Sequence, residues 1–146
     1  MRRILGTESL QRVVVDASVW VSRLTNQASS ATSRRWLERQ GNTGLLTWVP
    51  NLCLAEVAGA IARLSGDPLQ GLNAVRIEIL RFPHLRVVPL DETLGNRAME
   101  LAAHLRLRGS DAVYVATAES LAVPLVTWDH VLLQRAEGVV QVLPPS

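Results

Sequence analysis

The stretch Arg12-Val-Val-Val-Asp16 decides the fold, because three consecutive β-branched residues stand directly before a carboxylate. A continuous apolar run of this kind is typical of a parallel strand that is buried on both faces. The pattern recurs near the other end of the chain, where Pro124-Leu-Val-Thr-Trp precedes Asp129. We therefore expect two buried strands that each lead into an aspartate.

Around these two strands, further apolar runs alternate with helical patterns that are bounded by Gly, Pro, Asn or Ser. Strands are expected at 12–16, 45–49, 85–88, 125–127 and 139–143, and helices at 18–24, 29–40, 51–64, 68–80, 91–107, 111–122 and 129–136. Strands that alternate with helices at this spacing predict a parallel sheet with helices on both faces. The expected fold is one three-layer α/β/α sandwich over residues 1–146, with residues 1–11 as a short polar lead-in.

The composition is that of a globular chain long enough to bury a core, with 146 residues, 48% hydrophobic and 19% charged. No apolar stretch approaches the roughly 18 residues that span a membrane, and the N-terminus lacks the apolar segment of a secretion signal. Cys53 is the single cysteine, so no intrachain disulfide is possible. These features favour a cytoplasmic protein.

All fifteen residues of the Lys/Arg class are arginine. A GC-rich genome explains this bias, but the bias also removes every mechanism that needs a lysine beside a phosphate or carbonyl group. Receiver-type phosphoacceptors and haloacid-dehalogenase-like phosphatases, which also place an aspartate after the first strand, are disfavoured for this reason. The net charge of +2 hints at an anionic partner, and the planar arginine fork suits phosphate.

Four carboxylates occupy positions that a parallel α/β fold brings to one edge of the sheet. Asp16 and Asp129 follow strands, Asp111 opens a helix, and Glu56 lies on the second turn of the helix after the second strand. Ligands of open parallel sheets bind at the carboxyl ends of the strands. Carboxylates that gather there repel one another unless a cation joins them, and oxygen ligands select Mg²⁺ or Mn²⁺. We therefore predict a metal site.

Each of these residues also has a purely structural interpretation. Asp16, Asp111 and Asp129 are all placed to cap the N-terminus of a helix. Glu56 is harder to explain, because it lies in an otherwise apolar helix where an ionised carboxylate is costly. Arg63, two turns later on the same face of that helix, is the candidate partner for a salt bridge.

Two hydroxyl residues accompany the strand-end aspartates. Ser18 lies two residues after Asp16, and Thr127 lies two residues before Asp129, on the same face of an extended strand. Their hydroxyl groups are placed to orient a carboxylate or a metal-bound water. Ordinary capping of the strand ends is the alternative interpretation.

These segments resemble the motifs of the PIN domain, and in particular of the single-domain VapC-type toxins of prokaryotic toxin–antitoxin pairs. The matching segments are Val13-Val-Val-Asp-Ala-Ser-Val19, Pro50-Asn-Leu-Cys-Leu-Ala-Glu-Val57, Gly109-Ser-Asp-Ala-Val-Tyr-Val-Ala-Thr-Ala118 and Pro124-Leu-Val-Thr-Trp-Asp129. Each segment is short, but their order and spacing span nearly the whole chain. Two departures from the family pattern lie outside the acidic positions: the lead-in at residues 1–11, and the lack of an aromatic residue in His130-Val-Leu-Leu.

The resemblance implies a five-stranded parallel sheet and an Mg²⁺- or Mn²⁺-dependent endoribonuclease. It carries metal-binding and catalytic roles over to Asp16, Glu56, Asp111 and Asp129, with Thr127 and Ser18 as supporting hydroxyls. It further implies an RNA substrate, a homodimer, and a small antitoxin protein that blocks the site with a basic side chain.

Other side chains are candidates for contacts with RNA. Arginines suit its phosphates, the histidine beside Asp129 is close to the predicted site, and tryptophans either stack on bases or pack in the core. These candidates are Arg23, Arg63, Arg34, Arg35, His130, Trp20, Trp36, Trp48 and Trp128. The competing functions are a PIN-like module that binds RNA or protein without cutting, a deoxyribonuclease, and a housekeeping RNA-processing nuclease.

Overall fold

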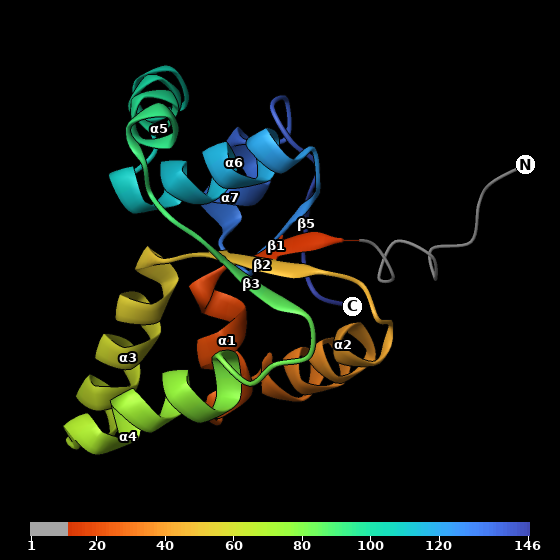
Figure 1. Cartoon of the computed structure of the whole chain (residues 1–146), viewed down its shortest axis with the longest axis vertical. Helices are drawn as coiled ribbons and strands as arrows, with labels where there is room; N and C mark the ends of the chain where they lie inside the picture. The colour runs from red at the N-terminus through yellow and green to blue at the C-terminus, as the bar shows by residue number, and fades with distance from the viewer. Residues whose placement is uncertain (1–11) are drawn as a thin grey trace, which may run out of the picture.

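The computed structural model describes residues 12–146 (Figure 1). The central strand of its sheet is β1 (Val13–Val15), which has a neighbouring strand on each side. The other strands are β2 (Thr47–Pro50), β3 (Leu85–Val88), β4 (Leu125–Val126) and β5 (Val142–Leu143). They lie in the order β3-β2-β1-β4-β5, and every neighbouring pair is parallel. Val14 is in register with Trp48 of β2 and with Leu125 of β4.

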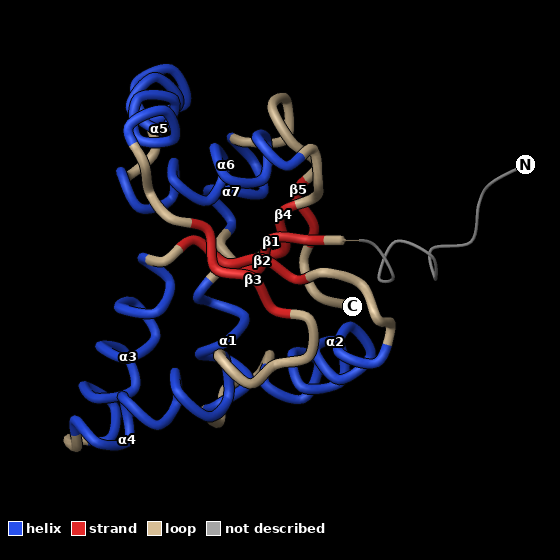
Figure 2. The backbone as a smooth tube through the Cα atoms, viewed as in Figure 1, coloured by secondary structure: helices blue, strands red, loops and turns tan. Residues whose placement is uncertain are grey.

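Helices cover both faces of this sheet, with the strands as the middle layer (Figure 1, Figure 2). One face carries α1 (Ala17–Leu24), α2 (Ser30–Asn42), α3 (Leu52–Ser65) and α4 (Pro68–Asn73), which continues into the π-helical segment η2 (Ala74–Ile79). The other face carries α5 (Glu92–Leu105), α6 (Gly109–Leu121) and α7 (His130–Arg135). The predicted α/β/α sandwich with a five-stranded parallel sheet is therefore confirmed.

The last strand is shorter than the sequence predicts. We expected it over 139–143, but the strand is limited to Val142–Leu143. Val139 and Val140 belong to the turn after α7, where the N–H groups of both residues bond to the carbonyl of Ala136. The apolar run continues through this turn because Val140 is buried against the core, although it pairs with no strand.

The helix predicted for 68–80 keeps its extent but changes its hydrogen bonding at Ala74, where the π-helical segment begins. The N–H of Leu80 accordingly bonds to the carbonyl of Val75, five residues earlier. The lead-in predicted at residues 1–11 lies outside the described residues. Within residues 12–146, no helix combines the length and apolar character needed to cross a bilayer.

Strand β1 and helix α6 are among the most deeply buried elements of the core. Val13, Val14 and Val15 are at most 1% exposed, as expected for a strand covered on both faces. Every residue of α6 from Asp111 to Ala118 is buried, because this helix packs on α5 and also on β1, β2 and β4. Burial on several sides explains why α6 is apolar nearly all round rather than along one stripe. It also fixes the start of α6 against the sheet.

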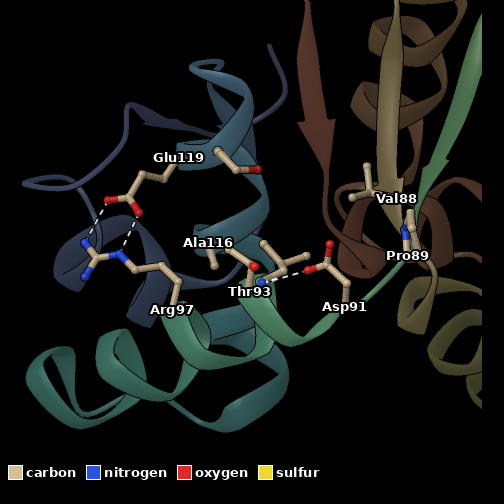
Figure 3. A pocket seen from close by; sticks show the side chains of 9 residues that line it. Val88, Pro89, Asp91, Thr93, Arg97, Ala116 and Glu119 are labelled. Carbon is tan, nitrogen blue, oxygen red and sulfur yellow. Dashed lines mark hydrogen bonds and ion pairs between the residues drawn. The ribbon is translucent and has the colours of Figure 1, made fainter.

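A pocket of about 310 Å³ lies between the end of β3 and the facing sides of α5 and α6 (Figure 3). Arg97 of α5 reaches across to Glu119 of α6 with two hydrogen bonds of 2.7 and 2.8 Å, and these bonds lower the pKa of Glu119. Along the axis of α6, Glu119 lies about 12 Å beyond Asp111. The pocket is therefore separate from the aspartate at the start of α6.

The hairpin of α3 and α4 depends on a glycine at its contact surface. Gly66, with φ +71°, ends α3 in the left-handed conformation, and the Asp67 carboxylate then caps α4 by accepting the N–H of Leu69. A Cβ atom on Gly71 of α4 would lie 2.4 Å from the carbonyl oxygen of Ala58 in α3. The two helices approach closely because this position has no side chain.

We expect Gly71→Ala to destabilise the fold by about 1–3 kcal/mol, since the added methyl group meets backbone that cannot move freely. Gly95→Ala is the matched control: a Cβ there meets no atom within 4 Å, and replacing a glycine inside helix α5 should stabilise by about 0.5–1 kcal/mol. Urea unfolding monitored by tryptophan fluorescence measures both. Equal effects of the two substitutions would contradict the close approach of α3 and α4.

Candidate metal centre

The four predicted carboxylates all lie where a strand ends or a helix begins. Asp16 follows β1 and stands at the N-cap position of α1, and Asp129 follows β4 and stands at the N-cap position of α7. Asp111 is in the first turn of α6, and Glu56 is in the second turn of α3. The parallel sheet directs the ends of β1 and β4 to one edge, which also receives the starts of these helices.

The structure brings these carboxylates close enough to perturb one another. Burial raises the pKa of Asp16, which is 6% exposed, and the negative charge of Asp111 adds to that increase. Burial also raises the pKa of Glu56, with further contributions from the charges of Asp16 and Asp111. The pKa of Asp111 is raised by burial and additionally by Asp129. Positions that span residues 16–129 therefore form one acidic cluster.

The two predicted hydroxyls lie at the centre of this cluster and join the ends of β1 and β4. Thr127 is fully buried and donates to Oδ2 of Asp16 at 2.8 Å, while its Oγ1 accepts the N–H of Asp129 at 3.0 Å. Ser18 lies 3.3 Å from the Thr127 hydroxyl and accepts the N–H of Trp128 at 3.1 Å. Both hydroxyls thus cap strand ends and orient Asp16 at the same time.

Tyr114 is a member of the cluster that the sequence analysis missed. Its hydroxyl donates to Oε1 of Glu56 at 2.7 Å and accepts the N–H of Ala17 at 3.2 Å. Burial raises the pKa of this phenol, so Tyr114 is a neutral hydrogen-bond donor to the carboxylate. The available signal was its place on α6: the only tyrosine of the chain lies one helical turn after Asp111.

Glu56 thus has a tyrosine as its partner, whereas Arg63 forms no ion pair within residues 12–146. The salt bridge considered as an alternative for Glu56 is therefore not formed. Arg63 is instead exposed in the last turn of α3, about 10 Å of helix away from Glu56.

Arg108 is the second residue that the sequence analysis missed. It stands at the N-cap position of α6, and its guanidinium lies between two of the carboxylates. The Nε atom donates to Oδ2 of Asp111 at 3.3 Å, and Nη2 lies 3.8 Å from Oδ2 of Asp129. The side chain is 80% exposed, so it covers the cluster from the solvent side. The sequence feature that could have identified Arg108 is its position three residues before Asp111 at the start of a helix, a spacing that allows the two side chains to meet.

The other arginines proposed for RNA contacts have different partners. Arg23 lies in the last turn of α1, pairs with Glu78 at 3.5 Å and stacks over Phe82 at 5.9 Å. Arg34 donates to the carbonyl groups of Arg23 and Thr25. Arg35 is exposed on α2 and donates to Thr32. A phosphate contact stays a prediction for each, but the structure places none of them in a contact with the acidic cluster.

The tryptophans divide into two groups. Trp20 and Trp36 are at most 3% exposed in the core, so they have no surface on which a base could stack. Trp48 and Trp128 are partly buried, and Trp128 donates its indole N–H to Ser33 at 2.8 Å. His130 is exposed at the start of α7, next to Asp129.

The donor chemistry of the cluster fits a divalent cation, because carboxylate oxygens are hard ligands and each retains lone pairs beyond its hydrogen bonds. Asp16, Glu56, Asp111 and Asp129 are the residues that would hold it. Within residues 12–146, however, no three acidic, histidine or cysteine side chains are spaced to hold one ion as they stand. Arg108 occupies part of the space between the carboxylates, so ion binding requires side chains to rearrange.

Comparison with models of protein families matches residues 13–138 to the PIN domain. The chain belongs to the PIN-domain family. PIN domains are in general nucleases that use a divalent metal ion, and the acidic cluster of this PIN domain has the ligand type that such an ion prefers. No curated protein matches the chain in sequence.

Several solved structures share the fold of this PIN domain, among them a toxin–antitoxin complex from Klebsiella pneumoniae, which is 15% identical with a TM-score of 0.69 and covers 92% of this chain and 98% of that chain. VapBC2 from Rickettsia felis, bound to a DNA fragment from its promoter, is 13% identical with a TM-score of 0.72 and covers 93% of this chain and 100% of that chain. FitAcB from Neisseria gonorrhoeae is 19% identical with a TM-score of 0.71, covering 91% and 97%. VapC20 from Mycobacterium tuberculosis, a toxin that cleaves the sarcin-ricin loop, is 20% identical with a TM-score of 0.68, covering 81% and 90%. At these identities the likeness shows the fold.

We expect Asp16→Asn to raise the melting temperature of the metal-free protein at pH 7. The pKa of Asp16 is raised above 3.8 in the folded state, so the folded state holds the proton more tightly than the unfolded state does. Stability contributed by this group is therefore present at low pH and is lost as the pH rises above about 4. The amide side chain of the variant does not ionise, so this loss of stability does not occur, and its oxygen can still accept the hydrogen bond from Thr127.

Differential scanning fluorimetry from pH 4 to pH 8 in a chelator measures the effect, which should grow with pH. Glu38→Gln, on the exposed side of α2, is a matched control and should show no such trend. An Asp16→Asn variant that is less stable than the wild type at pH 7 would show that the carboxylate stabilises the fold rather than straining it.

Proposed function

We propose that this PIN domain is an Mg²⁺- or Mn²⁺-dependent endoribonuclease that acts in the cytoplasm as the toxin of a toxin–antitoxin pair. The observation that carries the proposal is the convergence of Asp16, Glu56, Asp111 and Asp129 in one cluster of a PIN fold, where the charges of the three aspartates raise the pKa of a neighbouring carboxyl group. Buried carboxylates of like charge lower stability unless a cation offsets them. A function that uses the cation explains why these carboxylates lie together.

The protein's own side chains orient the proposed ligands. Thr127 fixes one oxygen of Asp16, Tyr114 fixes one oxygen of Glu56, and the N–H groups at the start of α7 fix Oδ1 of Asp129. The remaining lone pairs are available to a cation and to the water molecules around it. A divalent ion held by Asp16, Glu56, Asp111 and Asp129 would supply a lowered pKa for a bound water and would offset charge on the attacked phosphate.

The neighbouring structures support the substrate and the partner. One of them cleaves the sarcin-ricin loop, and others are complexes of a toxin with its antitoxin. By analogy, we propose RNA as the substrate of this chain and a small antitoxin protein as its partner. A homodimer is proposed on the family resemblance alone. A deoxyribonuclease or a housekeeping RNA-processing nuclease would use the same four carboxylates, so the toxin role rests on these neighbours.

A PIN-like module that binds RNA or protein without cutting is the second candidate. It is favoured by the spacing of the cluster, since no three ligand-type side chains of residues 12–146 are arranged to hold one ion as they stand. Metal binding by the wild-type protein separates the two candidates.

We expect Mn²⁺ to raise the melting temperature of the wild-type protein, because a ligand that binds only the folded state adds about 2.7 kcal/mol at 100 times its dissociation constant. Glu56→Gln should remove most of this increase, since it deletes a charged ligand of the cluster, whereas Glu38→Gln should retain it. Thermal unfolding with and without Mn²⁺ gives the answer. If the wild type shows no increase, the non-catalytic module is the better description.

We expect Asp16→Asn to reduce metal-dependent RNA cleavage by more than about 100-fold, because changes around a metal ligand alone cost 10–100-fold. Incubation with total RNA in Mg²⁺, followed by sequencing of the cleavage ends, reports both activity and target. Chelation should abolish cleavage by the wild type, and Glu38→Gln should cleave normally. Cleavage by Asp16→Asn at the wild-type rate would remove Asp16 from the proposed site.

A further inference from the structure

The position of Arg108 is unusual for a structural ion pair. Its guanidinium faces two carboxylates of the cluster at 3.3 and 3.8 Å, but 80% of the side chain is exposed. Within residues 12–146 its only polar contacts are with Asp111 and Asp129. Asp111 and Asp129 are only 10% and 24% exposed, but solvent screens the exposed guanidinium and weakens both ion pairs. The side chain is therefore held at the cluster by one hydrogen bond and by the charges of the two carboxylates, and it can leave when those charges are neutralised.

We propose that Arg108 is the arginine that binds the RNA phosphate at the site of cleavage, and that it reaches this phosphate when a divalent ion replaces it on Asp111 and Asp129. This inference rests on the proposed function and names the residue that holds the substrate there. In the metal-free state Arg108 is a counter-ion for the carboxylates. In the metal-loaded state the same guanidinium binds the RNA phosphate.

Electrostatics favours this exchange. A divalent ion on Asp111 and Asp129 would offset their charges and repel the guanidinium, which would remove the attraction that holds Arg108 there. A phosphate that approaches an ion on these carboxylates brings new negative charge within the present reach of Arg108. The planar fork of arginine binds phosphate oxygens in pairs, and little burial is lost when so exposed a side chain moves.

The other arginines proposed for RNA contacts are less suited to this role. Arg23 is already paired with Glu78, and Arg34 is bonded to two carbonyl groups. Arg63 is exposed but lies about 10 Å of helix from Glu56. Arg108 alone among the arginines of residues 12–146 has a salt bridge to a carboxylate of the cluster.

Arg108→Gln tests the proposal, with Arg86→Gln as the control that makes the same change of charge. Arg86 is exposed on the edge strand β3, where it donates to the carbonyl of Leu85. Binding of a fluorescent single-stranded oligoribonucleotide is measured by anisotropy in Ca²⁺, with gels confirming that the RNA stays intact. The titration is repeated at several salt concentrations, and Mn²⁺ binding is measured separately by calorimetry.

We expect Arg108→Gln to weaken RNA binding by about 10- to 100-fold, as for the loss of a hydrogen bond to a charged group. The slope of log affinity against log salt should fall by about 0.7, the value for one phosphate contact on a single strand. Mn²⁺ should bind this variant at least as tightly as the wild type, because a competing cation has been removed. Arg86→Gln should match the wild type in all three measurements.

Two results would overturn the proposal. RNA affinity and salt slope that match the wild type would show that Arg108 does not bind phosphate. Loss of Mn²⁺ binding in Arg108→Gln would show that the arginine supports the geometry of the cluster instead. Failure of the proposed function looks different, because the wild type itself would then neither bind Mn²⁺ nor cleave RNA.

Discussion

The acidic cluster is organised around a side chain that is almost buried at the end of the central strand. Asp16 follows the three valines of β1 and is 6% exposed, so its ionised form must be stabilised by groups that other elements supply. Thr127 donates to it from the end of β4, which the strand order places beside β1. The same hydroxyl accepts the N–H of Asp129, so one side chain orients two of the acidic residues. The sheet order and the acidic cluster are consequences of one arrangement.

Tyr114 extends this arrangement to the helices. Its phenol bonds to Ala17 at the start of α1 and to Glu56 in α3, while its backbone belongs to α6. Tyr114 therefore joins α6 on one face of the sheet to α1 and α3 on the other face (Figure 1), at the edge where the carboxylates lie. Because the phenol stays neutral, it orients Glu56 without offsetting its charge. The fold thus holds the cluster in place and leaves most of its charge for another partner to balance.

The periodicity of the sequence predicted the elements well, because apolar runs such as Val13–Val15 have one stable placement in a covered parallel sheet. The periodicity also placed Asp16 and Asp129 at strand ends, because that prediction requires only the position of each residue along its own strand. Tyr114 and Arg108 were missed because their contacts depend on how α6 is rotated against α1, α3 and α7. Helical spacing alone suggested Arg63 as the partner of Glu56, but Glu56 bonds instead to Tyr114 of another helix.

The spacing of the four carboxylates bears on how tightly they would bind an ion. A site whose binding-competent arrangement is only partly populated binds its ligand more weakly by that fraction. In the proposed exchange, an ion would have to displace Arg108 from Asp111 and Asp129, so the small free energy of that displacement would be subtracted from the affinity for the ion. A negative phosphate that receives the displaced guanidinium returns part of that free energy. Metal and substrate would therefore bind cooperatively through one exposed arginine, and each would strengthen the binding of the other by the same factor.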